Sequence, residues 1–220
     1  MDVMYALYKH WTDMILSGEK PLEFRTKLPK DMKPGTKILL YETRKHNGAG
    51  AVVGECTVKD IIPIKNGTRW PLVGCYPFLD WYCEHIRNDV ALANHIRAIR
   101  SEFDNMPGYR YGFVSRYIFS TRTLEQLRLT GRPFDLMQMT IDERDEILKE
   151  YEKANDLEYE CDDWLTKIGL YNEFGETNYQ YALVLENPVR YQVPKQLNEF
   201  KGTNGKPIGN APQSYCYATL

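Results

Sequence analysis

The sequence predicts an α+β fold in which a small β-barrel, built from both ends of the chain, is interrupted by a mainly helical insertion. Residues 1–77 contain several short strand-like runs separated by turn signals, and strand character returns in residues 178–220. Between them, from Pro77 onward, apolar residues recur at helical spacing. We therefore expect residues 78–177 to form a helical insertion that packs on the barrel.

The barrel strands are expected at Asp2–Tyr8, Leu22–Thr26, Thr36–Arg44, Ala51–Ile64 and Tyr179–Glu186, with a short helix at His10–Ser17. Several short strands bounded by turns favour a barrel over a doubly wound sheet. We expect Asn187 and Pro188 to turn the chain before an edge strand at Val189–Val193, because proline cannot donate to a sheet. From Pro194 the chain is rich in glycine and proline, which predicts loop.

The insertion is expected to contain amphipathic helices. Phe78, Trp81 and Tyr82 begin one helical pattern, and Asp156–Tyr171 predicts a later helix. The run Tyr109–Ser120 interleaves aromatic residues with arginine, which is compatible either with packing or with stacking on a single-stranded nucleic acid.

Composition excludes several classes of protein. With 43% hydrophobic and 13% aromatic residues in 220, the chain can fill a core, so disorder is not expected. No apolar run approaches the roughly 18 residues of a membrane span, and the N-terminus lacks a signal-peptide pattern, which predicts a cytoplasmic location without membrane contact. Five cysteines without a C-x-x-C pair indicate reduced thiols, and four unpaired histidines indicate no metal site. No cofactor is expected.

Charge is unevenly distributed although the net charge is only −2. Residues 9–45 hold nine Lys/Arg against five Asp/Glu, and residues 84–132 hold eight against five. Residues 140–163 hold eleven acidic residues against three basic ones, so this segment masks basic surface elsewhere. Phosphate binding depends on local potential, so the distribution is compatible with RNA or a nucleotide as partner and equally with ordinary solvated faces.

A polar cluster follows the first helix. Gly18 stands where a helix ends, because glycine adopts the left-handed C′ conformation without strain. The helix end, the glycine turn and the strand that follows present Lys20, Glu23 and Arg25 together, which supplies two charged donors and one acceptor. This mixture suits a polar, planar ligand edge or a phosphate. The alternative is an exposed ion pair between Glu23 and Arg25, worth only ~0–1 kcal/mol.

The pattern Gly18-x-Lys20-x-x-Glu23-x-Arg25 resembles the G-x-K-x-x-E-x-R signature of the ASCH domain family, small β-barrels similar to PUA domains. Three further stretches resemble strands of that family, namely Lys37–Thr43, Ala51–Glu55 and Tyr181–Pro188. The resemblance covers roughly residues 1–82 and 178–217 and leaves the segment between them unexplained.

The resemblance implies a cleft beside the first helix that binds RNA, a nucleotide or a nucleobase. It assigns ligand-binding roles to Gly18, Lys20, Glu23 and Arg25, with Lys9 and Trp11 at the border of the same hollow. Lys20 and Arg25 would bind phosphate or a base edge, and Glu23 would accept from an exocyclic amine.

Two other functions stay open. Some ASCH-like proteins are amidohydrolases of N4-acylated cytidine that use a threonine three residues after the motif lysine. Here Glu23 occupies that position and Thr26 is out of register, so an enzyme of this kind would have to rely on Lys20 and Glu23. The third hypothesis is a regulatory adaptor that binds a protein partner through the helical insertion.

Overall fold

The structure of the chain is a computed structural model, which describes residues 1–64, 76–94, 96–97, 156–157, 159–171 and 177–220. It divides into two compact units, of which the first combines Met1–Asn66 with Thr177–Leu220 and the second comprises Gly67–Glu176. Each unit is described by itself. None of the helices within the described residues is long and apolar enough to cross a membrane.

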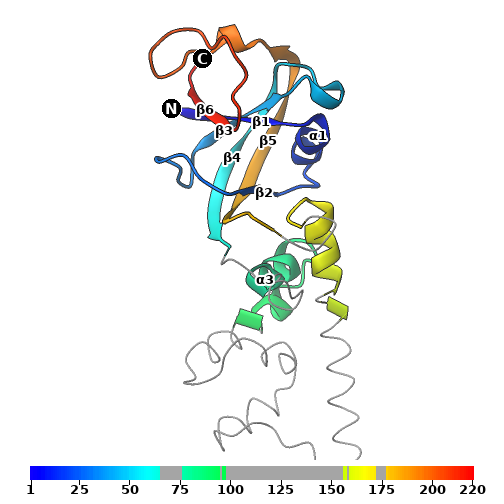
Figure 1. Cartoon of the computed structure of the whole chain (residues 1–220). Helices are drawn as coiled ribbons and strands as arrows, with labels where there is room; N and C mark the ends of the chain where they lie inside the picture. Colours follow the sequence, from blue (N-terminus) through cyan, green and yellow to red (C-terminus); the bar gives the residue numbers. More distant parts are fainter. Residues whose placement is uncertain (65–75, 95, 98–155, 158, 172–176) are drawn as a thin grey trace, which may run out of the picture. The chain divides into compact units, whose positions relative to one another are not determined.

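The first unit is a six-stranded sheet curled into a half-barrel (Figure 1). Its strands are β1 (Asp2–Leu7), β2 (Leu22–Arg25), β3 (Lys37–Glu42), β4 (Val52–Pro63), β5 (Tyr181–Lys195) and β6 (Tyr215–Ala218). The order across the sheet is β2-β5-β4-β3-β1-β6. Strands β1 and β3 are parallel and the other neighbours are antiparallel. The predicted α+β class, with strands from both ends of the chain in one sheet, is confirmed.

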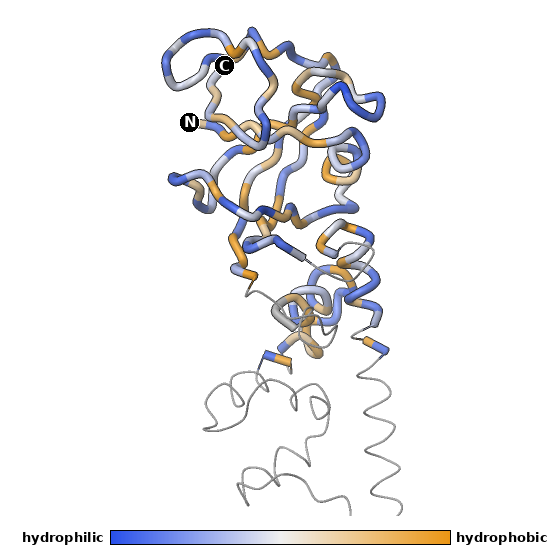
Figure 2. The backbone as a smooth tube through the Cα atoms, in the orientation of Figure 1, coloured by the Kyte–Doolittle hydropathy of each residue, from blue (hydrophilic) through white to orange (hydrophobic). Residues whose placement is uncertain are grey.

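Alternate residues of the strands build two cores, one on each face of the sheet. In β1, Val3, Tyr5 and Leu7 belong to one core together with Ile15 of the first helix. Met4 belongs to the other, which includes Phe200, Leu39 and Tyr41. Because successive strand residues point to opposite faces, covering both faces requires a nearly continuous apolar strand. Figure 2 accordingly shows hydrophobic stretches concentrated in the strands and hydrophilic ones in the loops.

Helix α1 (Lys9–Ser17) is one residue longer than predicted and ends at Gly18. Gly18 is left-handed, with φ 84°, and its N–H donates to the Ile15 carbonyl, which confirms the predicted C-terminal cap. On the buried side, Thr12 Oγ1 lies 2.7 Å from Glu42 Oε1, and the Ala49 N–H donates to Glu42 Oε2 at 3.0 Å. Glu42 thereby ties α1 to the end of β3 and to the loop before β4, where the short helix η1 (Lys45–Asn47) lies.

The predicted turn at Asn187 and Pro188 is wrong, because β5 runs through both residues. Thr57 pairs with Glu186 and Glu55 pairs with Val189, so β5 carries one more residue than β4 over this interval. A β-bulge accommodates a proline that has no N–H to donate, and Asn187 supplies the positive φ, 51°. The strand therefore bends rather than ends.

The C-terminal segment is not only loop, which corrects a second prediction. After the short helix η3 (Leu197–Glu199), the chain returns as β6 and pairs with β1 at the end of the sheet. Four residues between glycine- and proline-rich flanks give too short a pattern for sequence reasoning to detect.

The second unit is helical where the structure describes it. Helix α3 (Tyr76–His85) confirms the helical pattern predicted there, and it buries Phe78 and Leu79. Residues 159–167 form a further helix, whose Trp164 stacks on Trp81 with ring centroids 5.7 Å apart. The predicted run Tyr109–Ser120 lies outside the described residues. Helicity throughout the insertion, and its packing on the barrel, stay predictions.

Candidate functional site

Strand β2 and the turn before it carry an ion cluster that the structure buries. The Glu23 cluster, as we call Lys20, Glu23 and Arg25, places one carboxylate between two cations. Glu23 Oε2 lies 3.6 Å from Lys20 Nζ, and Glu23 Oε1 lies 2.8 Å from Arg25 Nη2. The exposed fractions of the three side chains are 4%, 8% and 13% respectively. This burial excludes the alternative of an exposed surface ion pair.

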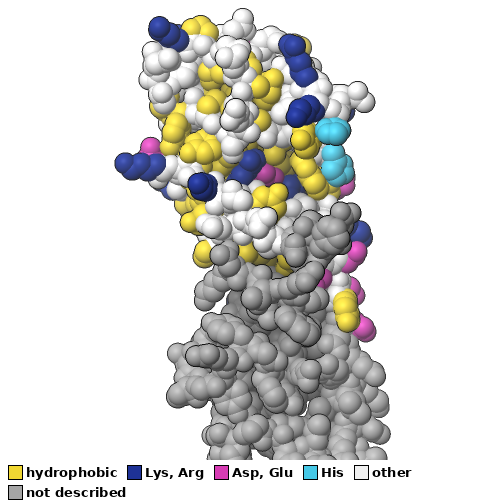
Figure 3. Space-filling model, in the orientation of Figure 1, with side chains coloured by type: hydrophobic (Ala, Val, Ile, Leu, Met, Phe, Trp, Pro, Cys, Tyr) yellow, Lys and Arg dark blue, Asp and Glu magenta, His cyan; other side chains and the backbone are white. Residues whose placement is uncertain are grey.

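Aromatic rings enclose the lysine. Lys20 Nζ lies 4.5 Å from the centroid of Phe24 and 5.0 Å from that of Trp11. Tyr179 packs on Phe24 with centroids 5.9 Å apart. Ring faces attract a cation, so Trp11 and Phe24 partly replace the water that Lys20 loses on burial. On the face of the first unit seen in Figure 3, basic and acidic side chains likewise lie side by side among hydrophobic ones.

Arg25 reaches across the curled sheet to β1. Its guanidinium carbon lies 3.8 Å from the ring centroid of Tyr5, although β2 and β1 are not neighbours in the sheet. The curl of the sheet thus brings strands from its two end regions together at this point.

Two buried donors at this contact lack an acceptor within the described part of the chain. Neither Arg25 Nε nor the Tyr5 hydroxyl has a hydrogen-bond partner among the described residues, and Tyr5 is fully buried. The Arg25 Nη2 contact with Glu23 is an ion pair without the alignment of a hydrogen bond. Native proteins leave few buried polar atoms unpaired, so each one requires an explanation.

Burial changes the proton affinities of the site. Desolvation lowers the pKa of Lys20 to about 8, and the neighbouring Glu23 opposes this shift. Desolvation raises the pKa of Tyr5 to about 12, and it raises that of Cys56, which lies near Glu23, also to about 12. At neutral pH the lysine is therefore mostly charged, while the phenol and the thiol keep their protons.

The remaining predicted residues are placed differently. Trp11 contacts Lys20. Gly18, two residues before Lys20, caps helix α1. Lys9 belongs to another network, which we call the Asp13 cluster: Lys9, Asp13 and Arg190. Asp13 lies 2.8 Å from Lys9 Nζ and 2.6 Å from Arg190 Nη2, and these side chains are 41–47% exposed.

Sequence reasoning missed Tyr5, Cys56 and Tyr179 as neighbours of the motif. Each comes from a different strand or connection, and no local spacing joins them to Glu23. Within the described residues, no group of three or more His, Cys, Asp or Glu side chains is arranged to hold a metal ion.

No family model matches the chain, and no curated protein matches it. Among solved structures, the chain is similar to ASCH from Zymomonas mobilis, with 13% sequence identity, a TM-score of 0.37 and coverage of 98% of this chain and 86% of that one. Two mutants of the same protein match with 14% identity and TM-scores of 0.37 and 0.36. A likeness of this degree assigns no ligand or activity, and the fold described above rests on its own strands and their order.

Proposed function

We propose that the first unit binds RNA, a nucleotide or a nucleobase at the Glu23 cluster. The observation that carries this proposal is the pair of buried donors, Arg25 Nε and the Tyr5 hydroxyl, that have no acceptor among the described residues. An unsatisfied buried donor costs about 1–3 kcal/mol. A ligand oxygen or ring nitrogen that accepts from both removes this cost, and because both donors are buried, binding requires the groups that cover them to move aside.

The charges of the cluster suit such a ligand. Lys20 and Arg25 outnumber Glu23, so the site carries one net positive charge when Lys20 is protonated, which favours a phosphate or a carbonyl edge. A carboxylate has about four lone-pair directions, so Glu23 retains capacity for an exocyclic amine beside its two cations. The motif resemblance to the ASCH family implies ligands of the same class.

The variant Tyr5→Phe tests the proposal. It removes an atom that no described residue binds, so we expect the free energy of unfolding to stay the same or rise. Affinity for cytidine 5′-monophosphate or a short mixed-sequence RNA should fall by about tenfold, the equivalent of one hydrogen bond of ~1.4 kcal/mol. Isothermal titration calorimetry and urea denaturation measure the two quantities.

The matched control is Tyr8→Phe, because Tyr8 is exposed and directly follows β1. This variant should keep wild-type affinity. Equal affinities of Tyr5→Phe and wild type, or no binding of any nucleotide or RNA at low salt, would remove the proposal. Binding of RNA should weaken as salt rises, because phosphate contacts release counterions.

The hydrolase alternative makes a different demand on the site. Amide hydrolysis needs a nucleophile or an activated water. Thr26 is exposed, outside the buried Glu23 cluster. The pKa values of Cys56 and Tyr5 are both raised to about 12, so the thiol and the phenol stay protonated at neutral pH. We expect no turnover of N4-acetylcytidine when cytidine release is followed by chromatography. Turnover that Lys20→Ala or Glu23→Gln abolishes would favour the hydrolase instead.

A further inference from the structure

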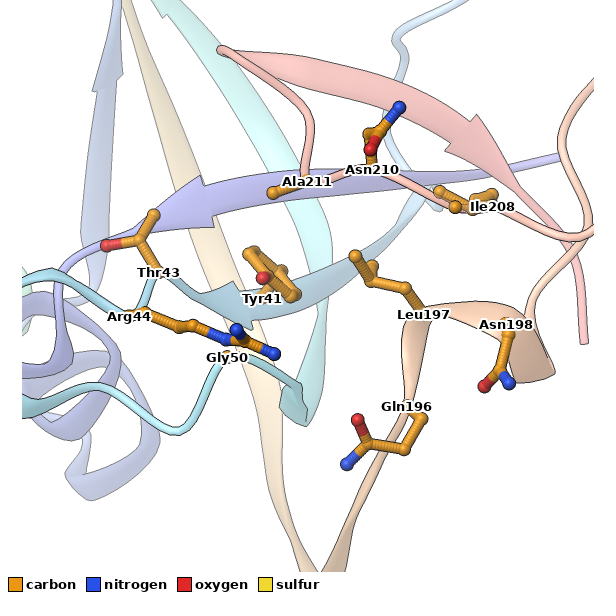
Figure 4. A pocket seen from close by; sticks show the side chains of 11 residues that line it. Tyr41, Thr43, Arg44, Gly50, Gln196, Leu197, Asn198, Ile208, Asn210 and Ala211 are labelled. Atoms are coloured by element: carbon orange, nitrogen blue, oxygen red, sulfur yellow. The ribbon is translucent and has the colours of Figure 1, made fainter.

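A second candidate site lies in a cleft on the face of the sheet that the C-terminal segment covers. The cleft has a volume of about 590 Å³, and residues from three stretches, 41–50, 196–198 and 208–211, line it (Figure 4). This volume is within the range of small-molecule sites, which is about 300–1,000 Å³. None of the lining residues belongs to the Glu23 cluster.

The floor of the cleft is apolar and aromatic. Tyr41 is a buried member of the core on this face, and Leu197 and Ile208 pack against that core while remaining partly accessible. Figure 4 shows the side chains of Tyr41 and Leu197 turned toward each other, with Ile208 beside them and Ala211 across from them. These groups offer a surface on which a flat or apolar body can pack.

One cation, Arg44, enters the cleft. In Figure 4 its side chain extends from the loop after β3 across Gly50 toward Leu197. Among the described residues no ion pair joins Arg44 to an acidic side chain, and none of the lining residues is acidic. The guanidinium is thus a planar donor that the fold positions without neutralising it.

Gly50 makes this position of Arg44 available. A Cβ atom at residue 50 would lie 2.7 Å from Arg44 Cγ and 2.8 Å from Arg44 Nε. Gly50 also has a positive φ, 64°, which side chains rarely adopt. Glycine at this point therefore lets the arginine lie flat along the cleft wall.

Residues 209–211 also line the cleft. The N–H groups of Gly209, Asn210 and Ala211 have no acceptor among the described residues. The cleft thus combines an apolar floor with one cation, Arg44, among its lining residues.

We propose that this cleft binds a small ligand with a flat, mainly apolar body and one anionic group, with Arg44 holding the anion and Tyr41 and Leu197 holding the body. The anionic group is a carboxylate or a phosphate, and both accept from a guanidinium in the same bidentate manner. The inference is independent of the proposed function of the Glu23 cluster, because the two sites share no residue.

Calorimetric titrations of the full chain test the proposal with matched probes. Adenosine 5′-monophosphate and indole-3-acetate supply a flat body with a phosphate or a carboxylate, and adenosine and indole-3-acetamide supply the same bodies without charge. At least one anionic probe should bind at least about tenfold more tightly than its uncharged partner, and Arg44→Gln should weaken that probe by about tenfold or more. The neighbouring exposed cation gives the control, Lys45→Gln, which should change affinity by less than about twofold.

Gly50→Ala provides a second test through geometry rather than charge. It should weaken the same probe because Arg44 must leave its place, and the thermal midpoint reports whether the fold persists. If Gly50→Ala unfolds the protein, Arg44→Gln alone tests the proposed site, because Arg44 is exposed and its substitution should leave the fold intact.

Nuclear magnetic resonance locates the bound probe and separates the two sites. Shifted amide signals at Gly50, Gly209 and Ala211 support the cleft. Shifts confined to the amides of Tyr5 and Glu23 would place the ligand at the Glu23 cluster and overturn the inference. Absence of binding by both anionic probes, or equal binding of charged and uncharged partners, would also overturn it.

Discussion

The Glu23 cluster and the Asp13 cluster have the same composition, one carboxylate between a lysine and an arginine, but opposite exposure. Side chains of the Asp13 cluster are 41–47% exposed, whereas those of the Glu23 cluster are 4–13% exposed. The lysines respond in opposite directions: a hydrogen bond to Asp13 raises the pKa of Lys9, whereas burial lowers that of Lys20 to about 8. Composition alone therefore does not identify a binding site, because clusters of the same composition differ in burial and in the pKa of their lysines.

The physical reason is the dielectric environment. Water screens the exposed cluster, so its pairs contribute little to stability. In the buried cluster the charges have lost water, and their ion pairs and the surrounding rings help to keep them charged. The buried donors beside Glu23 that have no acceptor among the described residues therefore gain a hydrogen bond when a ligand binds. Exposed donors gain little, because they already bind water.

The largest expected difference concerns stability. Glu23→Gln removes the carboxylate that pairs with both Lys20 and Arg25 in a buried site, and we expect the free energy of unfolding to fall by about 3–5 kcal/mol. Asp13→Asn makes the same isosteric change in the exposed cluster and should cost ~0–1 kcal/mol. Urea denaturation of both variants measures the contrast. Equal losses would show that the Glu23 cluster is as well solvated as the Asp13 cluster.

An intermediate effect concerns the pH dependence of nucleotide binding. Since the pKa of Lys20 is about 8 in the free protein, the lysine carries its charge below that pH and needs no proton uptake on binding. Above pH 8 binding to a phosphate requires a proton from solvent, so the affinity should fall by up to about tenfold per pH unit. The pKa of Tyr5, about 12, keeps its hydroxyl protonated in this window.

Calorimetry with cytidine 5′-monophosphate between pH 7 and pH 9.5, spanning the Lys20 pKa of about 8, measures this dependence. Lys20→Gln should bind weakly at every pH without the slope, and Lys9→Gln in the Asp13 cluster should keep it. A wild-type affinity that stays constant over this range would show that the charge of Lys20 takes no part in binding.

Much of the fold follows from sequence because the deciding signals are local. The alternation of apolar and charged residues in β2 and the glycine after α1 predict these structures within a few residues of chain. The sequence did not predict the path of β5. Asn187 and Pro188 are typical turn residues, but here a β-bulge keeps them within the strand. The sequence did not predict strand β6 either, because these four residues form a strand through their pairing with β1, which is far away in the sequence.

The candidate site likewise has a part that local sequence predicts and a part that forms only in the folded protein. A contiguous motif brings Lys20, Glu23 and Arg25 together, so their proximity could be predicted from spacing. Tyr5 could not, because its contact with Arg25 exists only after the sheet curls and brings β1 opposite β2. Whether a charged cluster is buried is likewise a property of the assembled fold, and this is why sequence could not rank the two clusters.

The smallest expected effect concerns Gly18, which ends helix α1 two residues before Lys20. Gly18 has φ 84°, and no described atom lies within 4 Å of the position that a Cβ atom would occupy, so Gly18→Ala meets backbone strain but no clash. We expect a loss of about 1 kcal/mol in the free energy of unfolding. Gly35→Ala is the matched control, because Gly35 has φ 85° and the same open surroundings.

The two glycine variants should differ in binding although they agree in stability. The Lys20 N–H donates to the Met14 carbonyl at 2.9 Å, so the turn at Gly18 fixes where the lysine leaves the helix. Relaxation of that turn moves Lys20 relative to Glu23, and nucleotide affinity should fall by about two- to fivefold, the equivalent of ~0.4–1 kcal/mol. Gly35→Ala should bind like wild type, since Gly35 precedes β3 and its N–H donates to the Val58 carbonyl. Equal affinities of both variants would mean that the helix end does not set the geometry of the Glu23 cluster, and that contacts of the Lys20 side chain, such as those with Glu23, Trp11 and Phe24, hold it in place instead.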